Sequence, residues 1–193
     1  LKDLFKVPKT LKELFEEAYT LETVFNINEI FDTKLAKTDW KLASSSSDKN
    51  EIAEIEIDGS RYQIKIEHLT YTDKNKNVHE FVNATFARWN GFAFDESLTL
   101  TTGGASKILG AIMNALRDRI NHQKYSAIVF AATDNVEKRM KIYNSMAWRL
   151  LKFFANDYGL IENQEFDGGK MSILVRKDQD ENAVEKIKGL IKK

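Results

Sequence analysis

The sequence predicts an α+β fold in which helices cover both faces of a mostly antiparallel central sheet. Two observations support this prediction. Between residues 51 and 89, apolar and polar residues alternate, which is typical of strands with one buried face. After residue 104, apolar residues recur at the helical period in two long segments, and a continuously apolar run lies between them.

Length and composition indicate one globular domain over residues 1–193. Hydrophobic residues make up 42% of the chain and charged residues 30%, a balance typical of soluble domains. The 29 basic and 29 acidic side chains give a formal net charge of zero. This argues against general nucleic-acid binding, because such proteins need a basic surplus. No apolar run is long enough to span a membrane, so we expect no membrane partner and a cytoplasmic location.

Residues that commonly bind metals are few and scattered. The chain has no cysteine, which excludes disulfides, thiolate nucleophiles and Cys-based zinc sites. His68, His79 and His122 are the only histidines, and their spacing matches no metal-binding motif. The sequence therefore predicts no metal site.

The N-terminal part is expected to hold one helix and one strand. Thr10 and Glu13 form a capping box ahead of an apolar stripe, which predicts a helix over residues 11–20 as an N-terminal appendage. Residues 40–44 fit a strand, and a polar loop follows them up to residue 50.

The clearest strand signal lies in residues 51–69. Alternation is strict on both sides of Asp58-Gly59, a two-residue turn that favours a tight hairpin. Counting outward from the turn pairs Ile55 with Tyr62 and Ala53 with Ile64 on a buried face. The opposite face then pairs Glu56 with Arg61 and Glu54 with Gln63, and this face is expected to be wet.

A glycine-containing aromatic corner follows the next strand, which is expected over residues 79–89. The corner contains Trp89, Phe92 and Phe94, and it leads to a short strand through residues 98–100. Two interpretations are open. The three aromatic side chains form a surface patch that binds a partner or a second copy of the chain, or they close the core over the sheet.

The rest of the chain predicts helices that alternate with apolar strands. The expected elements are a helix over 105–121, a strand over 125–133, a helix over 136–156, a strand over 170–177 and a polar C-terminal helix over 181–192 as an appendage.

The first of these helices begins at a glycine corner that resembles an anion site. The backbone amides of Gly104, Ala105 and Ser106 would be donors at the positive end of the helix, and the glycines, including Gly103, permit close approach. The alternative, which we favour from the residues alone, is a turn in which Ser106 or Thr102 caps the helix. The position of Lys107 does not fit a P-loop.

The order of elements from residue 51 to residue 176 resembles that of the GNAT N-acetyltransferase superfamily. In that family the corner after the fourth strand binds the coenzyme A pyrophosphate, and "LTTGGA" aligns with its motif through Gly103 and Ala105. The resemblance implies that Asn135 lies beside the coenzyme arm and that Tyr143 is the acid for the thiolate leaving group. The chain departs from the family at Leu100, where an Arg or Gln is usual, and in "SMAWRLL" after the tyrosine.

Two functions are consistent with these features. The first is a diverged, non-catalytic GNAT-like protein without a cofactor, which binds a protein partner or assembles through Trp89, Phe92 and Phe94. The second is an N-acyltransferase that uses acetyl-coenzyme A. The chain also resembles small uncharacterised GNAT-like proteins of tailed phages, which would place it in the host cytoplasm or the virion. Tyr143 falls on the apolar stripe of its helix, so a purely core position is also open.

Overall fold

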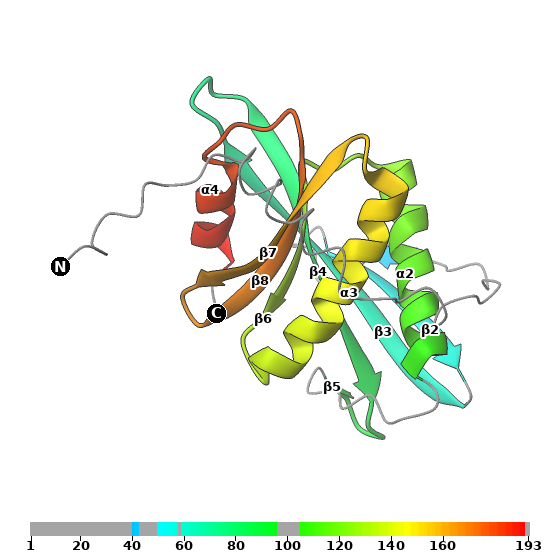
Figure 1. The fold of residues 1–193 in the computed structure, drawn as a ribbon. Coiled ribbons are helices and arrows are strands. Elements are labelled where there is room, and N and C mark those ends of the chain that lie inside the picture. The colour runs from blue at the N-terminus through cyan, green and yellow to red at the C-terminus, as the bar shows by residue number, and fades with distance from the viewer. Residues whose placement is uncertain (1–39, 43–49, 58, 96–104, 192–193) are drawn as a thin grey trace.

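The computed structural model describes residues 40–42, 50–57, 59–95 and 105–191. Strands in this part form an eight-stranded mixed sheet in the order β1-β2-β3-β4-β6-β8-β7, with β5 paired to β4 (Figure 1). The strands are β1 (Trp40–Leu42), β2 (Glu51–Ile57), β3 (Ser60–Thr72), β4 (Val78–Trp89), β5 (Phe94–Asp95), β6 (Ala127–Ala132), β7 (Tyr158–Phe166) and β8 (Gly169–Arg176). The helices are α2 (Ala105–His122), α3 (Val136–Phe154) and α4 (Ala183–Leu190). The architecture is α+β.

The β2–β3 hairpin has the register that the alternation predicts. Ile55 pairs with Tyr62 and Ala53 pairs with Ile64, so these side chains lie on one face of the sheet. Tyr62 is buried in the core, and the partly buried Ile55 packs against that core. The helix predicted over residues 11–20 and the strand predicted through residues 98–100 lie outside the described residues.

β4 and β6 form the one parallel pair among the described strands. Phe81 to Asn83 of β4 pair with Ala127 to Val129 of β6. Beyond these three residue pairs, β4 continues for six residues and pairs with the short β5, whereas β6 continues along β8. The two parallel strands therefore part in the direction of their carboxyl ends.

The sequence predicted no strand between the end of α3 and residue 170, and the structure corrects this with β7. This strand pairs with β8, but its register shifts between Ile161 and Gln164. Asn163 has a φ of 53°, in the left-handed region. The polar run from Glu162 to Glu165 and this irregularity break the alternation of apolar and polar residues by which a strand is recognised.

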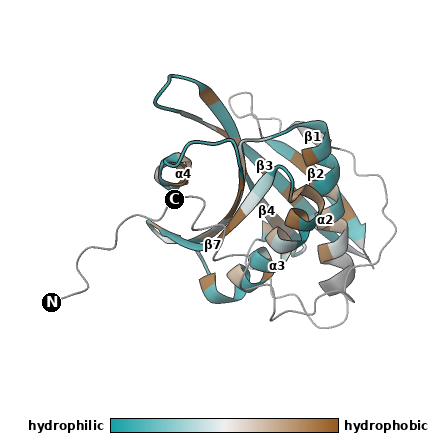
Figure 2. Ribbon diagram, turned by 45° about the horizontal axis from the view of Figure 1, so that its top comes forward, coloured by the Kyte–Doolittle hydropathy of each residue, from teal (hydrophilic) through white to brown (hydrophobic). Residues whose placement is uncertain are grey.

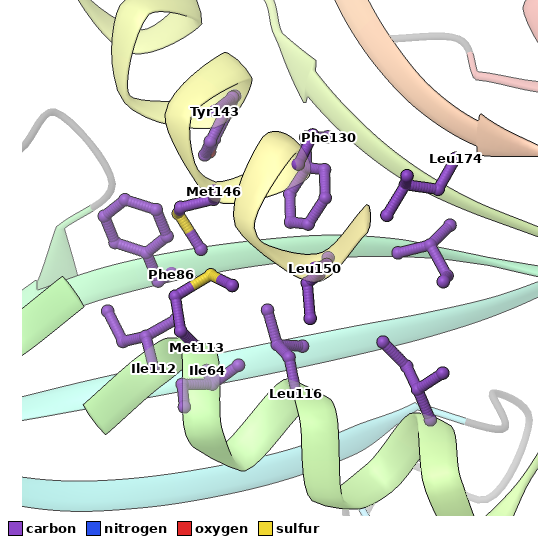
Figure 3. Packing of buried hydrophobic residues seen from close by; sticks show 14 of the residues in the cluster. Ile64, Phe86, Ile112, Met113, Leu116, Phe130, Tyr143, Met146, Leu150 and Leu174 are labelled. Carbon is purple, nitrogen blue, oxygen red and sulfur yellow. The ribbon is translucent and has the colours of Figure 1, made fainter. Parts of the chain in front are cut away.

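One face of the sheet is covered by α2 and α3. Side chains of this core come from both helices and from β3, β4, β6, β7 and β8, and Figure 3 shows some of them around Met146 and Leu150. Burying a side chain of this size contributes about 1.5–3 kcal/mol to folding.

The opposite face is covered by α4, so helices lie on both sides of the sheet (Figure 1). This segment was predicted to be a polar appendage, whereas Val184, Ile187 and the following Ile191 are buried against the sheet. Brown hydrophobic and teal hydrophilic residues both occur around α3 and α4 in Figure 2, as expected of amphipathic helices. Within the described residues, no helix is long and apolar enough to cross a membrane.

Candidate functional site

Tyr143 lies inside the core. Its side chain is fully buried in α3, with the ring edge-on to Phe86 (centroids 5.6 Å apart) and tilted against Phe130 (5.8 Å). The guanidinium of Arg139, one turn earlier, donates a 2.7 Å hydrogen bond to the Tyr143 hydroxyl. An acid for a leaving thiolate must contact the reacting sulfur. The Tyr143 hydroxyl instead faces a buried arginine among aromatic rings.

Asn135 precedes α3 at the carboxyl end of β6. Its backbone is left-handed (φ 46°), which asparagine tolerates better than most residues, and its carbonyl accepts the amides of Lys138 and Arg139. The Asn135 side chain makes no capping hydrogen bond and is exposed. Its position is therefore determined by the turn that starts the helix.

The glycine corner falls mostly outside the described residues. Gly103 and Gly104 precede the described part of α2, and Ala105 and Ser106 form its first backbone turn. The interpretation of this corner as a coenzyme A phosphate site stays a prediction.

The aromatic corner is built on the β4–β5 pair. Trp89 pairs with Phe94, and their rings meet edge to face at 5.2 Å. The guanidinium of Arg61, from the neighbouring strand β3, lies 5.1 Å from the Trp89 ring and 5.7 Å from the Phe94 ring. Arg61 is also held by a 2.8 Å ion pair with Glu54. Trp89 and Phe94 are thus half-buried by each other and by a cation.

Phe92 behaves differently from its two aromatic neighbours. It lies at the tip of the turn and is 94% exposed. The Asn90 side-chain oxygen accepts hydrogen bonds from the backbone amides of Phe92 (2.9 Å) and Ala93 (3.0 Å). The backbone amide of Asn90 donates to the Ala93 carbonyl at 3.0 Å. Gly91 supplies the positive φ of 106° that the turn requires. A hydrogen-bonded turn therefore holds an apolar ring in solvent.

A second group of side chains, which the sequence analysis did not identify, joins β2, β3, β4 and α2; we call it the His68 cluster. It consists of Glu51, His68, Glu80, Arg119 and Gln123. The His68 Nδ1 lies 2.6 Å from a Glu80 carboxylate oxygen, and its Nε2 lies 3.0 Å from a Glu51 oxygen. Both ring nitrogens are therefore within hydrogen-bond distance of a carboxylate.

The remaining contacts of the His68 cluster balance its charge. Arg119 forms an ion pair with Glu51 and donates to Gln123 at 3.0 Å, and Gln123 donates to Glu80 at 3.0 Å. The His68 side chain is only 5% exposed. The imidazole and Arg119 therefore meet two carboxylates in a largely desolvated place, where each polar group needs its partners.

Tyr125 borders this cluster. Its ring meets the His68 ring edge-on at 5.7 Å, and burial raises the pKa of Tyr125 to about 12. The Tyr125 hydroxyl and the Arg119 Nε are buried without a hydrogen-bond partner among the described residues. Sequence reasoning had no means of finding the cluster, because its members are up to 72 positions apart and none belongs to a motif.

The described residues contain no group of histidine, aspartate and glutamate side chains arranged to hold a metal ion. No protein-family model matches the chain, and comparisons with curated proteins and with solved structures gave no match. The fold and the geometry of these places are therefore the basis for a functional proposal.

Proposed function

We propose that this chain is a diverged GNAT-like protein that acts without catalysis, by binding a protein through the aromatic corner of Trp89, Phe92 and Phe94. The observation that carries the proposal is the presentation of Phe92. Its ring is 94% exposed, yet the turn that carries it is fixed by hydrogen bonds to Asn90. The ring is therefore available to a partner without a rearrangement of the turn.

The energetics of this corner favour binding. Burying an exposed phenylalanine ring contributes about 1.5–3 kcal/mol, and binding sites concentrate their energy in a few such aromatic residues. The hydrogen-bonded turn lowers the entropy lost on association, because the loop is already ordered. Arg61 adds a planar cation beside the rings.

The position of Tyr143 supports a non-catalytic function. The residue is fully buried, its ring is enclosed by Phe86 and Phe130, and its hydroxyl oxygen accepts a hydrogen bond from Arg139. Leu100 also lacks the charge-assisted hydrogen bonds that an arginine makes to a pyrophosphate.

The proposal is tested first as self-association, because a second copy of the chain is the protein partner at hand. Phe92→Ser should weaken the association measured by sedimentation equilibrium by about tenfold or more, since a loss of 1.4 kcal/mol has that effect. The melting temperature should stay nearly unchanged. Phe153→Ser, which removes another exposed phenylalanine on α3, is the matched control. A large drop in melting temperature for Phe92→Ser would show that this residue stabilises the fold instead.

The alternative function is an N-acyltransferase that uses acetyl-coenzyme A. The observation in its favour is the parting of β4 and β6, since ligands of open sheets bind beyond the carboxyl ends of parallel strands. In this alternative, Gly103, Gly104, Ala105 and Ser106 hold the pyrophosphate, Asn135 lies along the coenzyme, and Tyr143 is the acid.

Calorimetry with acetyl-coenzyme A separates the two functions. We expect weak or no binding to the wild type. Micromolar binding that Gly104→Val abolishes would overturn the proposal, because a valine side chain blocks the approach of a phosphate to the backbone. In that case loss of turnover in Tyr143→Phe would assign the acid.

A further inference from the structure

We propose that Asn90 is a modification site, where the side chain deamidates spontaneously through attack by the Gly91 amide. This is the only Asn-Gly pair in the sequence. Glycine after asparagine favours the reaction, because no side chain hinders the approach of its nitrogen. The structure adds three features that concern the electrophile, the nucleophile and the access of water.

The electrophile is the Asn90 carboxamide carbon. Its oxygen accepts two backbone amides, those of Phe92 at 2.9 Å and Ala93 at 3.0 Å. Attack on the carbon places negative charge on this oxygen. Two positioned N–H donors stabilise such an oxyanion, in the manner of the oxyanion holes of acyl-transfer enzymes. The turn that presents Phe92 therefore also activates the carboxamide.

The nucleophile is the Gly91 amide nitrogen, and none of the hydrogen bonds among the described residues uses it. Asn90 and Gly91 are both exposed. Apart from Gly91 itself and its two chain neighbours, no heavy atom lies within 4 Å of the position that a Gly91 Cβ would occupy. The Gly91 nitrogen is therefore accessible to hydroxide and water.

The reaction balances with water as the only co-reactant. Hydroxide removes the Gly91 amide proton, and the nitrogen forms a bond to the Asn90 Cγ. The bond from Cγ to Nδ2 breaks, and the leaving nitrogen takes a proton from water to become ammonia. The resulting succinimide is opened by water at either carbonyl. One opening gives aspartate, and the other gives isoaspartate, in which the main chain runs through Cγ.

The two products affect the turn differently. Aspartate keeps an acceptor for the amides of Phe92 and Ala93 and strengthens it by its charge. Isoaspartate adds a methylene to the main chain and carries its carboxylate on Cα, so the acceptor no longer lies where the Asn90 side-chain oxygen accepts the amides of Phe92 and Ala93. The next consequence rests on the proposed function. Isoaspartate at residue 90 would no longer hold Phe92 in its exposed position, which would limit the time for which this protein can bind its partner.

The chemical step is tested by mass spectrometry, which does not depend on the proposed function. The full chain is incubated in mildly alkaline buffer, both native and unfolded in urea, and digested with trypsin. We expect the peptide of residues 89–107 to show the mass increase of an amide converted to an acid, at least as fast in the native protein as in the unfolded chain. The peptide of residues 142–149, which contains Asn144 followed by serine, should stay unchanged.

A matched variant confirms the site. Asn90→Gln keeps a carboxamide, but ring closure would need a six-membered ring, so the mass shift of the 89–107 peptide should disappear. Slower conversion in the native protein than in urea would overturn the inference, because the folded turn would then protect Asn90. Equal conversion of the 142–149 peptide would overturn it as well.

Discussion

Replacing His68 by leucine should destabilise the protein far more than most single substitutions. The imidazole nitrogens lie 2.6 Å from a Glu80 carboxylate oxygen and 3.0 Å from a Glu51 carboxylate oxygen. A hydrogen bond to a charged group contributes about 1.5–3 kcal/mol, and removing one member of a buried ion pair costs about 3–5 kcal/mol. Glu51 keeps Arg119, and Glu80 keeps Gln123 and is partly exposed, which lowers the expected loss to about 3 kcal/mol.

Urea unfolding followed by circular dichroism measures this loss. With a slope of about 2 kcal/mol per molar urea, the midpoint of His68→Leu should fall by about 1.5 M. His122→Leu is the control, because His122 is 69% exposed on α2 and its 3.8 Å contact with Asp118 is a surface pair. The control should change the free energy of unfolding by no more than about 0.5 kcal/mol. Similar midpoints for the two variants would refute the view that the His68 cluster stabilises the fold.

Three further predictions concern other parts of the molecule. Gly169→Ala should lower the free energy of unfolding in urea by about 1–3 kcal/mol, because its Cβ would lie 2.0 Å from a backbone oxygen of β6. Gly189→Ala, where no atom lies near the added Cβ, should instead stabilise α4 by up to about 1 kcal/mol. An unchanged free energy of unfolding for Gly169→Ala would contradict the close approach. Burial raises the pKa of Tyr125 and Tyr158 from 10.0 to about 12, so the unfolded chain loses these protons at a lower pH than the folded protein does. The melting temperature should therefore fall as the pH rises from 10 to 12, and Tyr158→Phe should make this fall smaller. Tyr143→Phe should cost about 1.5–3 kcal/mol in the same unfolding assay, since it removes the hydrogen bond from a buried arginine; an unchanged midpoint would refute that estimate.

The hairpin shows how far local sequence information reaches. Its register follows from the two-residue turn at residues 58–59 and from strict alternation, because a slip by one residue would expose every apolar side chain. Ile55 accordingly pairs with Tyr62, and Ala53 with Ile64. The helical periods of α2 and α3 and the apolar run of β6 are equally local signals, and those elements are found within two residues of the expected ends.

The sequence predicted only part of the structure of the aromatic corner. The sequence placed Trp89, Phe92 and Phe94 at one turn, but it left open which of them face solvent. Pairing of β4 with β5 and the approach of Arg61 from β3 half-bury Trp89 and Phe94. Phe92 stays exposed because the Asn90 side chain directs the chain outward at the tip.

By itself the sequence determined the fold class, the hairpin register and the order of most elements, because each depends on neighbours within a few residues. Tertiary structure alone decided that β8 lies between β6 and β7, that β4 and β6 part after three residue pairs, and that α4 packs on the second face. It also brought His68 between Glu51 and Glu80. These features join residues that are far apart in the chain, and their stability comes from burial and charge pairing that no local pattern records.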